Sequence, residues 1–121
     1  MARALIVDDD EPIRSMLATI VKHHGFAVET ASDGDQAIAS IAKDGFDVVL
    51  LDLMMPRVDG WTVLRYMQEH HPELVSRTII ATAVPERETL RSINGPVFKV
   101  HQKPFAMEQL ISDVKAAAGA A

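Results

Sequence analysis

Length, composition and charge already narrow what this chain can be. Its 121 residues are 48% hydrophobic and 24% charged, which is typical of one globular domain and excludes a disordered chain. It has no cysteine, which excludes a disulfide scaffold and a thiolate metal site, and its net charge of -5 argues against sequence-independent nucleic-acid binding. No apolar stretch reaches the roughly 18 residues of a membrane span, and residues 1–4 do not begin a signal peptide. We therefore expect a single domain over residues 1–121.

Five short apolar segments predict buried strands. They comprise residues 4–7, 26–28, 46 with 48–51, 78–81, and 97–98 with 100. Most are continuously apolar rather than alternating, which is typical of strands covered on both faces in a parallel sheet.

Helical periodicity fills the intervals between these segments. Five apolar stripes have the spacing of one helical face. They are Ile13, Met16, Leu17, Ile20 and Val21; Ala37, Ile38 and Ile41; Trp61, Leu64 and Met67; Leu90 and Ile93; and Met107, Leu110, Ile111 and Val114.

Breakers and capping residues predict where several of these helices begin and end. Gly25 is a typical stop after the first helix, and Ser32 or Asp33 can cap the second. The third helix must end before Pro72, and residues 94–95, Asn-Gly, end the fourth. Strand and helix therefore alternate five times, which predicts an α/β fold of three layers with a doubly wound parallel sheet.

Polar side chains that suit one kind of chemistry follow four of the predicted strands. Ligands in such folds bind at the carboxyl ends of the strands, so these positions decide the function. Four acids follow the first strand, beginning with Asp8 and Asp9, and Asp52 follows the third. Thr82 ends the fourth strand, and Lys103 follows the fifth.

These residue types are suited to metal-assisted phosphoryl transfer. Clustered carboxylates repel one another unless a cation is present, and an oxygen-only donor set favours a hard ion such as Mg²⁺. Asp52, after four apolar residues, is placed as an oriented nucleophile. Lys103 and Thr82 supply a positive charge and a hydroxyl for the phosphoryl oxygens. A phosphoryl group adds roughly two negative charges, so we expect the site to need its metal.

Four motifs in this order resemble the receiver domain of two-component response regulators. They are Val7-Asp8-Asp9; Leu51-Asp52-Leu53-Met54-Met55-Pro56 with Asp59-Gly60; Thr82-Ala83; and Lys103-Pro104-Phe105. The resemblance runs from Leu5 to about Val114. It implies a flavodoxin-like five-stranded sheet in the order 2-1-3-4-5 and a cis peptide bond before Pro104.

The resemblance also implies a role for each matching residue. Asp52 is the phosphoacceptor for a histidine kinase or a histidine phosphotransfer protein. Asp9 and Asp52 are Mg²⁺ ligands, Asp8 assists through water, and the backbone carbonyl of Met54 completes the protein ligands. Lys103 pairs with the phosphoryl group, while Thr82 moves to meet it and carries the switch.

We expect such a domain to be cytoplasmic and to act on an unidentified downstream protein rather than on nucleic acid. It is not expected to be an enzyme beyond its self-catalysed phosphorylation and dephosphorylation. It resembles stand-alone, chemotaxis-type regulators, and the start at Met1 favours a natural N-terminus. A receiver fragment of a larger response regulator or hybrid histidine kinase is the alternative.

The sequence departs from the family pattern in its fifth strand. Val100 stands where an aromatic residue usually precedes the lysine by three, so we hypothesise that backbone movement after Thr82 carries the output. The interval from Thr82 to Lys103 is also short, which predicts a short fourth helix. Met54 and Val84 flank the site with apolar side chains, which predicts slow self-dephosphorylation because neither can orient a water.

Several other residues have a plain structural interpretation. Met16 and Met55 are expected to pack, Trp61 to lie on an apolar stripe, and Asp59-Gly60 to form a turn and cap. The paired histidines are expected at helix ends: His23, His24, His70 and His71.

The family's usual output face would be modestly basic and suit an acidic partner, although a solvated face is the favoured explanation of these residues. It would carry Arg87, Arg91, Lys99 and His101.

Two other classes of protein share parts of this chemistry. An aspartyl phosphatase of the haloacid dehalogenase type also uses Mg²⁺ and an Asp nucleophile, but places that nucleophile after the first strand. A flavodoxin-like cofactor binder needs a phosphate-binding loop there, where this chain has four acids.

Overall fold

The computed structural model describes residues 1–43, 45–93 and 95–119 of the chain. These residues form five strands: β1 (Arg3–Val7), β2 (Ala27–Ala31), β3 (Val48–Leu51), β4 (Thr78–Thr82) and β5 (Lys99–Gln102). They also form six helices: α1 (Glu11–His23), α2 (Gly34–Ala42), α3 (Gly60–His70), α4 (Pro72–Val75), α5 (Glu86–Ser92) and α6 (Met107–Gly119).

All five strands join one parallel sheet in the order β2-β1-β3-β4-β5. The register places Val7 beside both Ala31 and Leu51, and Leu51 beside Ile80. The last residues of the strands therefore meet along one edge of the sheet, where the predicted site residues follow them. This confirms the predicted fold class and strand order.

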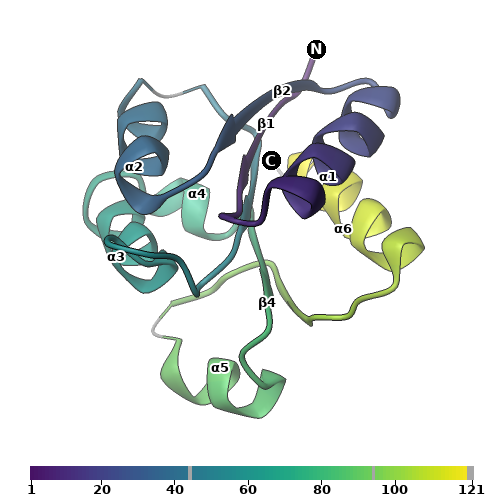
Figure 1. The fold of residues 1–121 in the computed structure, drawn as a ribbon. Helices are drawn as coiled ribbons and strands as arrows, with labels where there is room; N and C mark the ends of the chain where they lie inside the picture. The colour runs from purple at the N-terminus through teal and green to yellow at the C-terminus, as the bar shows by residue number, and fades with distance from the viewer. Residues whose placement is uncertain (44, 94, 120–121) are drawn as a thin grey trace.

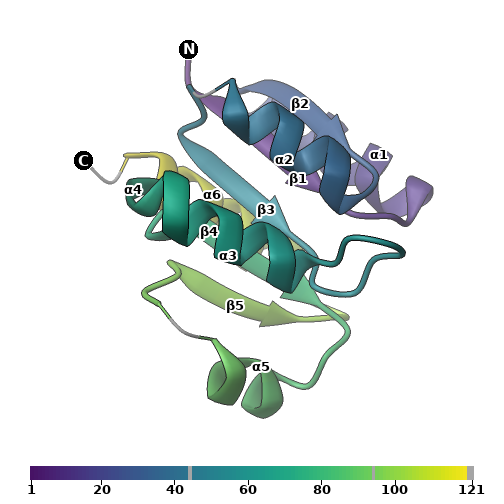
Figure 2. The ribbon, with the colours of Figure 1, turned by 90° about the vertical axis from the view of Figure 1, so that its left-hand side faces the viewer.

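The helices form layers on both faces of the sheet. Helices α2, α3 and α4 cover one face, while α1 and α6 cover the other (Figures 1 and 2). Helix α5 lies beyond β5, at the edge of the sheet, and contacts that strand (Figure 2).

Two hydrophobic clusters hold these layers to the sheet. Alternate residues of β1 point to opposite faces, so Leu5 and Val7 join the cluster under α2, α3 and α4. Ala4 and Ile6 join the cluster under α1 and α6. Each fully buried Leu, Ile or Val contributes about 1.5–3 kcal/mol, so this two-sided burial is the main stabilising term.

The predicted strand bounds agree with the observed ones to within two residues, except that β2 ends three residues later than predicted; the predicted segments for β2 and β5 both begin before the strand. Phe26 is buried yet precedes β2, and residues 97–98 precede β5. Both strands are sheet edges with partly exposed residues, so an apolar run does not mark their bounds.

The predicted helix boundaries are largely confirmed. Asp33 caps α2 by accepting from the backbone N–H of Gln36, and Gly25 follows α1 with a φ of +93°. The third helix ends at His70, but a further short helix, α4, begins at Pro72 and was not predicted. Asn94, the predicted end of the fourth helix, lies outside the described residues.

The predicted apolar faces of α1 and α5 are each partly wrong. Met16 was expected to pack, yet it is 44% exposed, while Leu17 and Val21 are buried. In α5, which is short as predicted, Leu90 is 59% exposed and Thr89 is fully buried instead. A helix of barely two turns offers too few positions for periodicity to define its inward face.

Within the described part of the chain, no helix is long and apolar enough to cross a membrane.

Two buried threonines give a matched test of packing in this fold. Thr89 Oγ1 is buried without a hydrogen-bond partner among the described residues, whereas Thr78 Oγ1 donates to the Leu74 carbonyl at 2.8 Å. We expect Thr89→Val to raise the free energy of unfolding by about 1 kcal/mol, because it removes a desolvated hydroxyl. Thr78→Val should lower the free energy of unfolding by about 1 kcal/mol, because it removes the hydrogen bond to the Leu74 carbonyl. Urea denaturation measures both, and destabilisation by Thr89→Val would contradict the packing described here.

Candidate functional site

The first carboxylates of the site lie in the turn that joins β1 to α1. Asp8 is 2% exposed, and its backbone N–H donates to the Ala31 carbonyl at 3.2 Å. Its Oδ1 accepts from the backbone N–H of Asp10 at 2.9 Å, and Arg14 donates to its carbonyl at 2.9 Å. Asp9 is exposed. Asp10 then caps α1, so the acidic run enters the helix directly.

Asp52 directly follows β3 and is 5% exposed. Its backbone N–H donates to the Val7 carbonyl at 3.0 Å, which places it beside the end of β1. Its Oδ1 accepts from the backbone N–H of Met54 at 3.1 Å. Gly60 packs so closely on this turn that a Cβ there would lie 2.6 Å from the Leu53 Cα, and closer still to the Asp52 carbonyl. Only glycine fits, as its predicted turn role requires.

Lys103 follows β5, an edge strand of the sheet, and contacts the two buried carboxylates. Its backbone N–H donates to the Thr82 carbonyl at 2.7 Å, which sets it beside the end of β4. Its Nζ donates to Asp8 Oδ2 at 2.8 Å and to Asp52 Oδ2 at 3.2 Å. Three strand ends are therefore linked through one ammonium group.

Thr82 ends β4 and is fully buried. Its Oγ1 accepts from the backbone N–H of Val84 at 3.3 Å. The hydroxyl thus lies at the start of the chain segment that leads from the site to α5.

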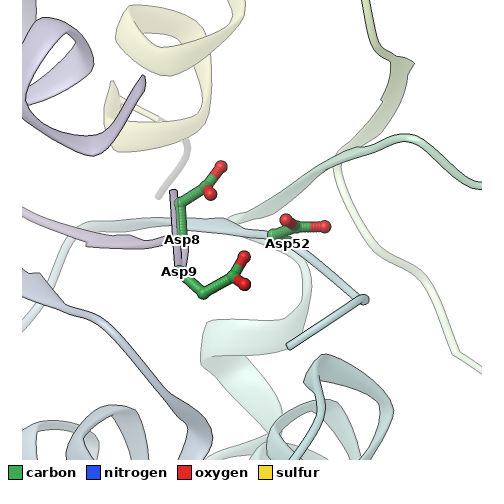
Figure 3. Close-up of side chains that lie close together, drawn as sticks. All are labelled: Asp8, Asp9 and Asp52. Atoms are coloured by element: carbon green, nitrogen blue, oxygen red, sulfur yellow. The ribbon is translucent and has the colours of Figure 1, made fainter. Parts of the chain in front are cut away.

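Asp8, Asp9 and Asp52 form a group that could hold a metal ion. One carboxylate oxygen from each lies within 4.8 Å of the others. Figure 3 shows Asp8 and Asp9 extending from the end of β1, and Asp52 from the neighbouring strand end. Two of these three carboxylates, those of Asp8 and Asp52, contact the ammonium group of Lys103, and a divalent cation would offset the negative charge that remains in the group. Oxygen donors alone are the set preferred by hard ions such as Mg²⁺.

The environment changes the acidity of the two central groups. Burial raises the pKa of Asp52, although the Met54 backbone N–H and the charge of Lys103 act in the opposite direction. Burial alone would lower the pKa of Lys103, but Asp8 and Asp52 stabilise its ammonium form and leave that pKa raised. The site therefore keeps a charged lysine beside a carboxylate that is costly to ionise.

The sequence-predicted site residues meet at one edge of the sheet. Asp8, Asp52 and Lys103 are in direct contact, and Asp9 and Thr82 lie beside them. The peptide bond before Pro104 is cis, as the resemblance implied. Asp59 caps α3 by accepting from the Thr62 backbone N–H, which confirms its structural role.

The structure corrects the predicted output face at one residue, His101, while Arg87, Arg91 and Lys99 are exposed as predicted, and it adds residues that the sequence did not suggest. His101 is not part of an exposed basic face, because its Nε2 lies 2.7 Å from Asp113 Oδ2 and its side chain is 10% exposed. Val100 is buried beside Ile80 in the sheet. Arg14 donates to the Asp8 carbonyl, and Arg57, in the loop that follows Asp52, donates to Asp33, yet no local sequence pattern marks either arginine.

A cavity of about 400 Å³ adjoins Lys103 on the α1 and α6 side. The exposed Met16 helps to line it, together with Ile13, Pro104, Phe105 and Met107. The surface next to the acidic cluster is therefore largely apolar.

Known proteins resemble this chain over most of its length. A family model for the response regulator receiver domain matches residues 4–115. Response regulator MprA from Mycolicibacterium vanbaalenii is 36% identical over 115 residues, covering 94% of this chain and 49% of that protein. MprA from Mycobacterium leprae is 35% identical over 115 residues, covering 94% of this chain and 50% of that protein. The chain spans about half the length of these curated relatives.

Solved receiver structures share the fold. The non-phosphorylated receiver domain of HemR from Leptospira biflexa has a TM-score of 0.89 at 23% identity, covering 100% of this chain and 97% of that one. Response regulator TrrA from Thermotoga maritima, in complex with Mg²⁺-BeF, has a TM-score of 0.85 at 26% identity, covering 97% and 99%.

The acidity of Asp52 predicts how stability depends on pH. Its pKa is raised in the folded protein, so ionisation opposes folding above the unfolded value of about 3.9. Without divalent metal, Asp52→Asn should raise the melting temperature near pH 7. This gain should vanish at about pH 3, where the Asp52 carboxyl is protonated in both the folded and the unfolded chain.

Asp33→Asn is the matched control with the opposite sign. The backbone N–H of Gln36 lowers the pKa of Asp33, so its ionised form stabilises the fold above about 3.9 and this stability is lost as the pH falls. Its replacement should therefore lower the melting temperature near pH 7. Equal melting temperatures for wild type and Asp52→Asn there would contradict the role of burial.

Proposed function

This chain belongs to the response regulator receiver domain family, and from that premise we propose that Asp52 accepts a phosphoryl group from a phosphohistidine. In this step the bond between phosphorus and the donor imidazole nitrogen breaks, and the nitrogen keeps the electron pair. A bond forms between phosphorus and one Asp52 carboxylate oxygen. The observation that carries the proposal is the contact of Lys103 with both Asp8 and Asp52 at the sheet edge.

We propose that Mg²⁺ occupies the acidic group. The carboxylates of Asp9 and Asp52 and the Met54 carbonyl would hold it, with Asp8 acting through water. When bound, the ion offsets the negative charge of the carboxylates and of the incoming phosphoryl oxygens. The support in this chain is the oxygen-only donor set and its excess of negative charge.

The other side chains have roles that follow from their positions. Lys103 already carries its charge between two carboxylates, so it is placed to pair with phosphoryl oxygens on Asp52. Thr82 would donate its hydroxyl to the same group. Because the Val84 backbone N–H is bonded to that hydroxyl, a shift of Thr82 would move the segment leading to α5.

The phosphoryl donor is a protein, either a histidine kinase or a histidine phosphotransfer protein. It must cover the edge around Asp52, and the cavity beside Lys103 offers apolar surface for that contact. We propose that the downstream target is also a protein. That nucleic acid is not a partner stays a prediction, and so does the cytoplasmic location.

The domain is proposed to act as a switch rather than as an enzyme that turns over substrate, since one acceptor stores one phosphoryl group. A stand-alone regulator and a receiver within a longer regulator both fit this role. The second is favoured by the curated relatives, of which this chain spans about half. Membership of the family removes the haloacid dehalogenase and flavodoxin alternatives.

Phosphorylation can be tested directly with a small phosphodonor. Incubation with acetyl phosphate and Mg²⁺ should add one phosphoryl group per chain, detected by intact mass. EDTA should abolish the addition, because the acidic group then repels the donor, and Asp52→Asn should abolish it by removing the acceptor. Asp35→Asn, at an exposed acid in the first turn of α2, is the control and should react as wild type does. A phosphoryl adduct on Asp52→Asn would refute the assignment.

The apolar flanks of the site predict a long-lived phosphoryl group. Met54 is 59% exposed beside Asp52, and neither it nor Val84 can orient an attacking water. We expect Met54→Asn and Val84→Glu to lose phosphate roughly threefold to tenfold faster than wild type, less than the 10²–10⁴ of a full general base. Phosphate release after removal of the donor measures the rates. Phosphate release from both variants that is no faster than from wild type would contradict this prediction.

A further inference from the structure

The loop between β3 and α3, residues 53–59, is fixed to its surroundings by backbone contacts. The Gly60 N–H donates to the Leu53 carbonyl at 3.0 Å and closes the loop at its base. The Gly34 N–H donates to the Val58 carbonyl at 3.1 Å, which ties the loop to the start of α2. A Cβ on Gly34 would clash with Val58, so this approach is as close as a backbone allows.

Arg57 lies in this loop with its backbone in the left-handed region, which residues other than glycine rarely adopt. Its φ is +63°, and it is the one non-glycine residue with positive φ among the described residues. A residue with a Cβ is strained there. Its guanidinium Nη2 donates to Asp33 Oδ2 at 2.7 Å, a contact that offsets part of this strain although the arginine side chain is 72% exposed.

The Asp33 carboxylate that binds this arginine is itself held in place. Asp33 is 6% exposed, and its Oδ1 accepts from the Gln36 N–H at 2.9 Å as the cap of α2. One carboxylate therefore holds both a helix terminus and the loop. The two partners are 24 residues apart in the chain, so their pairing depends on the packing of α2 beside the loop.

The same loop begins directly after Asp52, at the acidic group. Met54 follows Asp52 by two residues, and its N–H is bonded to Asp52 Oδ1. Met55 is buried in the core on one side, and the Arg57–Asp33 pair holds the loop three residues beyond Met54. The position of the Met54 carbonyl is thus set between these two fixed points.

We infer that the Arg57–Asp33 ion pair is a positioning device for the metal site, holding the 53–59 loop so that the Met54 carbonyl faces the acidic group. This inference rests on the proposed function, since it assumes that the acidic group binds Mg²⁺. Neither residue touches the ion. Both act through the backbone of the loop.

Positioning and simple charge effects predict opposite results for one of the two partners. Through charge alone, Arg57→Asn would tighten Mg²⁺ binding, because it removes a positive charge near the carboxylates. Asp33→Asn would weaken binding on the same grounds. Positioning requires both substitutions to weaken it. Asn suits both sites, because it tolerates positive φ at residue 57 and still caps a helix at residue 33.

The experiment measures the dissociation constant of Mg²⁺ by the fluorescence of Trp61, the single tryptophan. It directly follows Gly60, which packs on the Asp52 carbonyl. The Mg²⁺-dependent rise in melting temperature gives a second readout that needs no fluorescence change. The variants are Arg57→Asn, Asp33→Asn, the double variant and Arg57→Lys, with Arg87→Asn on the exposed face of α5 as control.

We expect each single Asn variant to raise the dissociation constant roughly twofold to fivefold, a modest effect because the arginine side chain of the ion pair is 72% exposed. The double variant should be no weaker than the singles, because both remove the same interaction. Arg57→Lys should restore most of the affinity, and Arg87→Asn should not weaken it.

Unchanged or tighter binding by Arg57→Asn would overturn the inference while leaving the proposed metal site intact. So would additive losses in the double variant. A wild-type protein that shows no response to Mg²⁺ in either readout would overturn both the inference and the metal part of the proposed function.

Discussion

Two buried carboxylates share one ammonium group, and the rest of the site depends on that arrangement. Asp8 and Asp52 are nearly inaccessible to water, and Lys103 lies 2.8 Å and 3.2 Å from their oxygens. Removing such charges from water costs several kcal/mol unless partners are fixed in place. A parallel sheet provides that fixation, because the ends of β1, β3 and β5 are held in register while helices exclude water from both faces.

The loops at this edge are ordered by polar contacts that also begin the helices. Asp10, Asp33 and Asp59 each cap the helix that follows them. The acidic turn after β1 and the loop after β3 are therefore both tied to helix termini, which leaves the carboxylates little freedom to relax. If a cation binds this group as proposed, it would meet Asp8 and Asp52 carboxylates that are already fixed by hydrogen bonds, so less of its binding energy would be spent on ordering the chain.

The sequence predicts an element accurately where its hydrophobic pattern is strong over neighbouring residues, and less accurately where exposure or short length weakens that pattern. Strands β1, β3 and β4 are predicted well because they are largely buried on both faces and contain runs of three or four apolar residues. For the edge strands β2 and β5, the predicted segments begin one or two residues early and end two or three residues early, because exposure dilutes their apolar pattern. The prediction that Leu90 lies on the inward face of α5 is wrong, and Thr89 is buried instead, because seven residues are too few to define an apolar stripe.

The sequence by itself determined which chemical groups stand at the strand ends, since Asp8, Asp52, Thr82 and Lys103 each follow or end a recognisable apolar segment. The tertiary structure alone decided which of them touch. Lys103 and Asp8 are 95 residues apart, and Arg57 meets Asp33 and His101 meets Asp113 only across packed elements. Such contacts depend on strand register and on the crossover of each helix, and short-range patterns of hydrophobicity do not encode the direction of a side chain in a neighbouring loop.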